Sequence, residues 1–89
     1  MEINEVIFPR TLPKLDLHGY DRDSARLAIE DFIEENIKMG NEIVTIIHGV
    51  GTGIIRETTI NTLKKNKRVI DFKNDYMNRG CMIVKIEKI

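Results

Sequence analysis

Two segments of this chain each have the pattern of a β-strand that ends in His-Gly, and each is followed by the pattern of a helix. Residues 15–18 alternate apolar and polar side chains and stop at Gly19, which is typical of a short strand with one buried face. Residues 42–48 are rich in isoleucine, valine and threonine before Gly49, which favours a central strand parallel to the first. Because parallel strands need a crossover between them, this order indicates an α/β fold.

The segment between these strands predicts an amphipathic helix. Asp21 can cap its N-terminus, and Asp23 adds negative charge at the positive end of the helix dipole. Gly40 fits the left-handed position that commonly follows a helix. The apolar stripe expected to face the core consists of Ala25, Ala28, Ile29, Phe32 and Ile33.

The second half of the chain predicts one more helix and two more strands. The helix is expected over residues 54–66, and its core side is expected to contain Ile55, Thr58, Thr59 and Leu63. Strands are expected over residues 68–73 and 81–87, and the loop that joins them is expected to contain Asn74, Asp75, Asn78 and Gly80.

The element order is therefore β-α-β-α-β-β. Right-handed crossovers place consecutive helices on the same side of a sheet that winds in one direction. We expect a two-layer α/β sandwich with two helices on one face of a mixed four-stranded sheet. The other face would then be partly open, which suits a homodimer contact or a bound strand of nucleic acid.

Length and composition restrict the class of protein. With 89 residues the chain is long enough for one domain, which we place at residues 14–89 after a leader at residues 1–13. The leader contains Ile3, Val6, Ile7 and Phe8, which suit a short strand or a contact with another chain, although prolines interrupt it. Fourteen basic and 14 acidic residues cancel, so no global charge attracts a polyanion.

Cysteine content and hydropathy bear on where in the cell the protein is located. The single cysteine, Cys81, excludes an internal disulfide and a multi-cysteine zinc site, and its apolar neighbours predict a buried strand residue. The chain shows no signal-peptide pattern and no apolar stretch of ~18 residues. We therefore expect a cytoplasmic protein that does not enter the membrane.

The chemistry-bearing residues gather at the ends of the two parallel strands. Both His-Gly steps should leave the sheet at its carboxyl edge, where open α/β sheets bind ligands. Asp16, His18 and His48 would then converge. The glycines of the loop Gly49-Val50-Gly51-Thr52-Gly53 would let backbone N–H groups approach a phosphate at the start of the next helix. The alternative is that this loop is only a tight strand-to-helix turn.

These segments together resemble the Smr family, the small MutS-related domain. The resemblance covers residues 12–87 and depends on Leu-Asp-Leu-His-Gly at 15–19 and His-Gly-x-Gly-x-Gly at 48–53. It implies a fold similar to the C-terminal domain of bacterial translation initiation factor three. It also implies nicking or cleavage of DNA or RNA, or RNA binding at stalled ribosomes. One departure is Met82, which stands where the family often has a threonine that could contact phosphate.

Basic residues extend the expected nucleic-acid site. Residues 54–73 contain six basic and two acidic side chains. Lys64, Lys65 and Lys67 suit a solvated helix end. Arg56 lies one helical turn from the glycine loop, where a cation is unfavourable unless an anion neutralises it. The expected nucleic-acid-binding residues are Gly49, Gly51, Thr52, Gly53, Arg56 and Lys73.

Three functions remain open from the sequence. The first is an endonuclease for RNA or DNA, in which Asp16, His18 and His48 supply the acid–base chemistry. A divalent metal such as Mg²⁺ or Mn²⁺ is compatible with these residues, but their spacing does not require one. The second is a non-catalytic module that docks on RNA, the ribosome or DNA through the same face. The third is a small-nucleotide binder. In any of these functions Asp16 could serve only to cap a helix or loop N–H group.

Overall fold

The computed structural model describes residues 12–89, so the strand suggested within residues 1–11 lies outside the described part of the chain. The elements are β1 (Lys14–Asp16), α1 (Arg22–Lys38), β2 (Ile43–Ile47), α2 (Ile54–Lys65), β3 (Val69–Asp75) and β4 (Asn78–Ile86). This is the β-α-β-α-β-β order that the sequence predicts.

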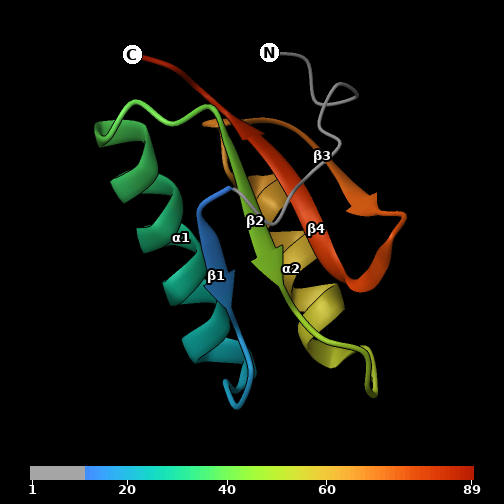
Figure 1. The fold of residues 1–89 in the computed structure, drawn as a ribbon. Helices are drawn as coiled ribbons and strands as arrows, with labels where there is room; N and C mark the ends of the chain where they lie inside the picture. The colour runs from blue at the N-terminus through green and yellow to red at the C-terminus, as the bar shows by residue number, and fades with distance from the viewer. Residues whose placement is uncertain (1–11) are drawn as a thin grey trace.

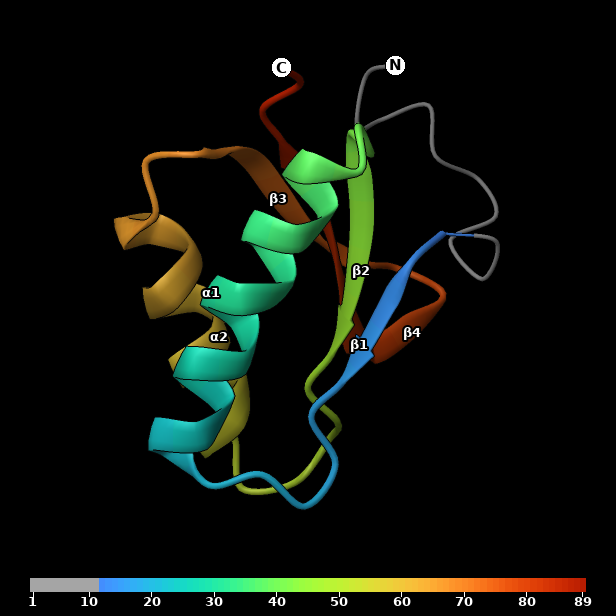
Figure 2. The same ribbon diagram turned by 90° about the vertical axis from the view of Figure 1, so that its left-hand side faces the viewer.

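The strands form one mixed sheet in the order β1-β2-β4-β3 (Figure 1). The β1–β2 pair is parallel, whereas β4 is antiparallel to both β2 and β3. Both helices pack on the same face of the sheet, as Figure 2 shows edge-on. The predicted two-layer arrangement is confirmed. Because β1 and β2 are parallel, the loops that follow them emerge at the same end of the molecule (Figure 2).

Local capping sets the ends of α1 as predicted. The side chain of Asp21 accepts a hydrogen bond from the backbone N–H of Ser24 at 2.8 Å. Gly40 follows the helix with φ +80°, a conformation that costs glycine little. Neither α1 nor α2 has the length and apolar composition that a membrane-spanning helix requires.

The core lies between the helices and the sheet. Side chains from α1, β2 and β4 fill it, among them Ile29, Val44 and Val84, each fully buried. The helix α2 contributes Leu63 together with three buried threonines. The hydroxyl groups of these threonines donate to backbone carbonyls one turn earlier, at 2.7 to 2.9 Å, and this removes the cost of burying them. The threonines are Thr58, Thr59 and Thr62.

The prediction of a loop over residues 74–80, between the last two strands, is wrong. The strands continue into a hairpin whose turn is residues 76–77, so Asn74, Asp75 and Asn78 belong to strands. The carboxylate of Asp75 accepts from the backbone N–H of Met77 at 2.9 Å, and Asn78 accepts from Gly80 at 2.9 Å. These polar side chains satisfy the backbone of a tight turn, whereas their composition suggested a longer loop.

The sheet face opposite the helices was also expected to be partly open, and this is wrong at the centre of that face. Ile43 and Ile83 form a buried cluster separate from the core beneath the helices, and Leu12 packs against this cluster. Thr45, on the same face, is 1% exposed. Cys81 is buried as predicted, and burial raises the pKa of its thiol. The two central strands are therefore buried on both faces.

Candidate functional site

A pocket of about 470 Å³ lies at the edge where β1 and β2 end. We call it the strand-end pocket. It contains the three predicted catalytic residues and five of the six predicted nucleic-acid-binding residues. It is lined by residues 16–20, 47–53, 55 and 56.

His48 is the most constrained polar residue of this pocket. Its backbone N–H donates to the carbonyl of Gly80 at 2.8 Å, and its side chain is buried with 8% exposure. The ring Nδ1 lies 2.8 Å from the carbonyl oxygen of Gly49. Because a carbonyl can only accept, Nδ1 carries the proton when this bond forms. Within residues 12–89, the buried Nε2 has no hydrogen-bond partner.

The environment of His48 favours the neutral imidazole. Burial lowers the pKa of His48 below its ordinary value, and the positive charge of Arg56 lowers it further. The hydrogen bond to Gly49 acts in the opposite direction, with an effect on the pKa smaller than that of burial and larger than that of Arg56. A neutral ring with its proton on Nδ1 leaves a lone pair on Nε2, which can accept a proton or a hydrogen bond.

Asp16 and His18 occupy the exposed side of the pocket. One carboxylate oxygen of Asp16 accepts from the backbone N–H of His18 at 2.9 Å. This is the local capping role that the sequence left open for Asp16. Both side chains are exposed, so solvent or a ligand can reach them.

The glycine loop presents an uncapped helix N-terminus to the pocket. Gly49 and Gly53 have φ angles of +80° and +88°, in the left-handed region that glycine tolerates best. Gly53 is the N-cap of α2, and among the described residues no side chain caps this helix end. Its first-turn N–H groups can therefore donate to an anion. At Gly51 an added Cβ would meet no atom within 4 Å, so the loop is open there.

The two basic residues predicted for the site have different locations. Arg56, in the first turn of α2, lines the strand-end pocket. Lys73 does not. It lies on β3 opposite Ile83, and the register pairs the other side of Ile83 with Thr45 of β2. The strand β4 therefore separates Lys73 from β2, which His48 follows, so Lys73 lies outside the pocket, and its part in nucleic-acid binding stays a prediction.

Comparison with known proteins agrees with this geometry. Residues 15–87 match the Smr domain family. The chain belongs to this family. It is 41% identical over 68 residues to Endonuclease MutS2 of Ligilactobacillus salivarius, which covers 76% of the chain and 9% of that protein. It is 34% identical over 76 residues to Endonuclease MutS2 of Staphylococcus saprophyticus, with 85% and 10% covered. The chain thus spans about a tenth of the curated relatives it matches.

Solved structures share the fold. The Smr domain of Thermus thermophilus MutS2 superposes with a TM-score of 0.83 at 26% identity, covering 85% of this chain and 99% of that one. YdaL, a stand-alone small MutS-related protein from Escherichia coli, gives a TM-score of 0.79 at 23% identity, covering 84% and 64%. The latter likeness concerns the fold alone.

Two residues of this Smr domain site were missed by the sequence analysis. Gly80 on β4 lies so close to Gly49 that an added Cβ would be 3.1 Å from the Gly49 Cα. A glycine within a strand often marks such an approach, but the sequence predicted a loop at Gly80, so this signal became visible only with the strand β4. Tyr20 lines the pocket with 41% exposure, and its backbone N–H donates to Leu17 at 3.0 Å. Its signal was an aromatic residue directly after the first His-Gly step.

Metal ligands are sparse in the Smr domain. No three His, Cys, Asp or Glu side chains of residues 12–89 are grouped so that they could hold a metal ion. Asp16 is the carboxylate of the strand-end pocket. Mg²⁺ commonly uses one or two carboxylates together with substrate phosphates, so a metal that arrives with substrate stays a prediction.

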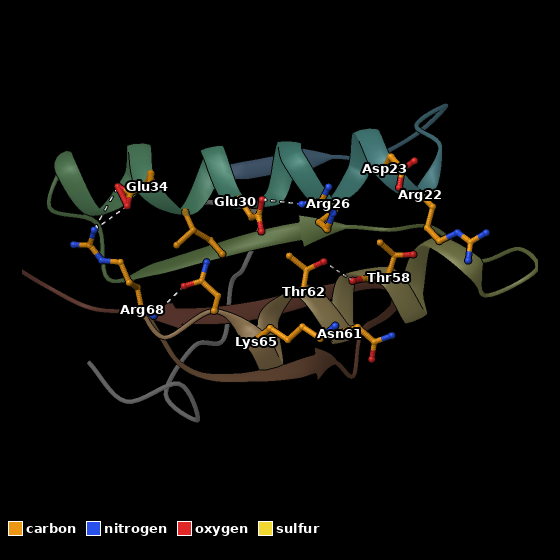
Figure 3. Close-up of a pocket in the computed structure, with 12 residues that line it drawn as sticks. Arg22, Asp23, Arg26, Glu30, Glu34, Thr58, Asn61, Thr62, Lys65 and Arg68 are labelled. Atoms are coloured by element: carbon orange, nitrogen blue, oxygen red, sulfur yellow. Dashed lines mark hydrogen bonds and ion pairs between the residues drawn. The ribbon is translucent and has the colours of Figure 1, made fainter.

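A second hollow lies between α1 and α2 (Figure 3). Most of its charges are paired with one another. Arg26 lies 3.4 Å from Glu30, and Arg68 lies 2.9 Å from Glu34 (Figure 3). None of the predicted site residues lines this interhelical groove.

Proposed function

We propose that this Smr domain binds nucleic acid at the strand-end pocket and cleaves a phosphodiester bond there. The observation that carries the proposal is the buried His48 ring, whose Nε2 lacks a partner among the described residues and which shares its pocket with an uncapped helix N-terminus. A proton acceptor and an anion site within one pocket are the two elements that phosphodiester hydrolysis requires. The name Endonuclease MutS2, given to relatives that contain a similar domain, supports the same reaction.

The glycine loop and Arg56 would hold the phosphate. The first-turn N–H groups of α2 offer donors to its oxygens, and the open space at Gly51 lets the backbone approach. Arg56 lies at the positive end of the α2 dipole, where its charge is unfavourable until an anion binds. Its guanidinium would make charge-assisted hydrogen bonds to the phosphate oxygens.

His48 would act as the general base. In hydrolysis a water oxygen forms the new bond to phosphorus, and its proton moves to the Nε2 of His48, which is buried here and would have to be uncovered when substrate binds. The hydrogen bond from Nδ1 to Gly49 holds the ring in the tautomer that this step needs. The bond between phosphorus and the leaving oxygen breaks, and the exposed His18 would donate a proton to that oxygen. Asp16 would act as a positioning residue, since it accepts from the His18 backbone.

The alternative is a non-catalytic module that docks on RNA, the ribosome or DNA through the same pocket. The hydrogen bond from the His18 backbone N–H to Asp16 favours this alternative, because the carboxylate oxygen that accepts it already caps the turn. In that case the glycine loop and Arg56 would suffice for binding, and the acid–base residues would be dispensable.

Cleavage assays separate the two functions. The pure protein is incubated with labelled single-stranded RNA, duplex DNA and supercoiled plasmid, with and without Mg²⁺ or Mn²⁺. We expect cleavage that falls by about 100-fold or more in His48→Gln and clearly in Asp16→Ala, which removes the acceptor for the His18 backbone N–H, while binding persists. Asp71→Ala is a matched control, because Asp71 also caps a local N–H group, that of Phe72 at 2.8 Å, but lies on β3.

The outcomes are distinct. Binding without cleavage by the parent protein selects the docking module. Cleavage that survives His48→Gln removes His48 from the reaction. A parent protein that neither binds nor cuts any of these nucleic acids contradicts both functions.

A further inference from the structure

Another hollow, of about 550 Å³, adjoins the strand-end pocket between the N-terminal ends of α1 and α2. We call it the helix-end hollow. The two depressions have Tyr20, Thr52 and Ile55 in common, so they form one continuous surface. The helix-end hollow is lined by Tyr20, Asp21, Arg22, Asp23, Thr52, Ile54 and Ile55.

The lining of this hollow suits a flat, uncharged group. Tyr20 is 41% exposed and Ile54 is 52% exposed, so an aromatic ring and an aliphatic side chain meet solvent on its walls. Two carboxylates also line it, those of Asp21 and Asp23. The backbone N–H of Ser24 lowers the pKa of Asp21, which keeps that carboxylate charged at neutral pH. The carboxylates outnumber the single cation of the lining, Arg22, so the net negative charge disfavours a phosphate here, in contrast to the strand-end pocket.

We infer that the helix-end hollow is a nucleobase subsite, which takes an unpaired base stacked on Tyr20. This inference depends on the proposed function, since the phosphate of the same or the next nucleotide would lie in the strand-end pocket. The shared wall of the two depressions matches a ligand that joins a charged phosphate to a neutral base. Aromatic side chains bind bases through their π-faces without regard to sequence.

The subsite determines the substrate class. A base within a duplex is stacked between its neighbours and paired, so it cannot enter a hollow at the protein surface without being extruded. The Smr domain should therefore prefer single-stranded nucleic acid, or a single-stranded stretch within a larger molecule.

The carboxylates predict a further preference among bases. Ionised Asp21 and Asp23 are hydrogen-bond acceptors only. Figure 3 shows Asp23 and its neighbour Arg22 at the N-terminal end of α1. Adenine and cytosine present exocyclic amino donors, whereas uracil does not. Oligomers of adenine or cytosine should bind more tightly than oligomers of uracil.

Tyrosine fluorescence provides a direct test. The chain has no tryptophan and two tyrosines, so Tyr76→Phe leaves Tyr20 as the single strong emitter. Tyr76 lies in the β3–β4 turn, lines neither depression and is 82% exposed, so its substitution should not disturb the fold. This protein is titrated with a short oligoadenylate RNA and with an abasic oligomer of the same length. We expect saturable quenching of Tyr20 by the first and none by the second.

Affinity measurements with variants complete the experiment. Tyr20→Ala should weaken binding of the oligoadenylate by roughly 10- to 100-fold, and Tyr20→Phe, which keeps the ring, should retain most of it. Tyr76→Ala is the matched control and should bind like the parent protein. The abasic oligomer should bind weakly to the parent protein and show no further loss with Tyr20→Ala.

Two results would overturn the inference in distinguishable ways. If the abasic and base-bearing oligomers bind with equal affinity and Tyr20→Ala changes neither, the hollow takes no base, while phosphate binding stands. If neither oligomer binds the parent protein, the proposed function fails and the subsite fails with it.

Discussion

The backbone of Gly80 on β4 touches the backbone of Gly49 in the loop after β2. The Gly80 carbonyl accepts hydrogen bonds from His48 at 2.8 Å and from Gly49 at 3.0 Å. A Cβ built on Gly80 would lie 3.1 Å from the Gly49 Cα and 3.2 Å from its carbonyl carbon. The strand β4 therefore fixes the position of the His48 backbone, and of the start of the glycine loop, relative to the sheet.

Gly80→Ala should destabilise the protein, because two backbone segments must separate to admit the methyl group. We expect a loss of about 1–3 kcal/mol in the free energy of unfolding, measured by urea denaturation. Gly51→Ala is the control: an added Cβ there meets nothing within 4 Å, and the change should stay within about 0.5 kcal/mol. Equal stability of the two variants would show that the contact with Gly49 is not tight.

Gly51→Val should impair nucleic-acid binding far more than folding. The φ angle at Gly51 is not positive and the surrounding space is open, so valine fits the folded loop. Its side chain would however occupy the approach of a phosphate, and we expect about a tenfold or larger loss of affinity by fluorescence anisotropy. Gly53→Ala should instead lose about 1 kcal/mol of stability, since φ is +88° there. Unfolding of Gly51→Val would indicate a purely structural turn.

The buried His48 should make stability depend on pH. Its folded-state pKa is lowered, so below about pH 6.5 the unfolded chain binds more protons than the folded one, and stability falls as pH decreases. Between about pH 7.5 and about pH 5.5, wild type should lose more unfolding free energy than His48→Gln. His18→Gln retains His48 and should follow wild type. Parallel curves for wild type and His48→Gln would contradict the burial of a neutral ring.

Arg56→Ala should change the salt dependence of nucleic-acid binding. If Arg56 neutralises one phosphate, the slope of log K against log salt should become shallower by roughly 0.7–0.9, and affinity at low salt should fall. Lys64→Ala is the control, because Lys64 lies in the last turn of α2 and lines neither depression. A folded Arg56→Ala protein with the parental slope would remove Arg56 from the phosphate site.

Short sequence patterns were sufficient to predict the features that depend on interactions between residues close together in the chain. The ends of α1 follow from Asp21 and Gly40, because capping involves atoms within a few residues of the helix end. The convergence of His18 and His48 follows from two strand patterns joined by one helix, because parallel strands must end at the same edge.

Predictions were wrong where distant segments decide the outcome. Lys73 lies away from the pocket because β4 inserts between β2 and β3, and strand order is not encoded near residue 73. The tight β3–β4 turn depends on side chains such as Asp75 that cap a backbone bend, and composition alone does not separate this from a longer loop.

The sequence by itself thus determined the element order, the helix caps and the edge of the sheet at which the two histidines meet. Only the tertiary structure decided which of the two histidines is buried. His48 is buried at the start of the loop, where its backbone and that of Gly49 donate to Gly80, whereas His18 stays exposed beside Asp16. The physical reason is that desolvation depends on atoms brought from other elements, and two identical His-Gly steps differ only in what the fold packs around them.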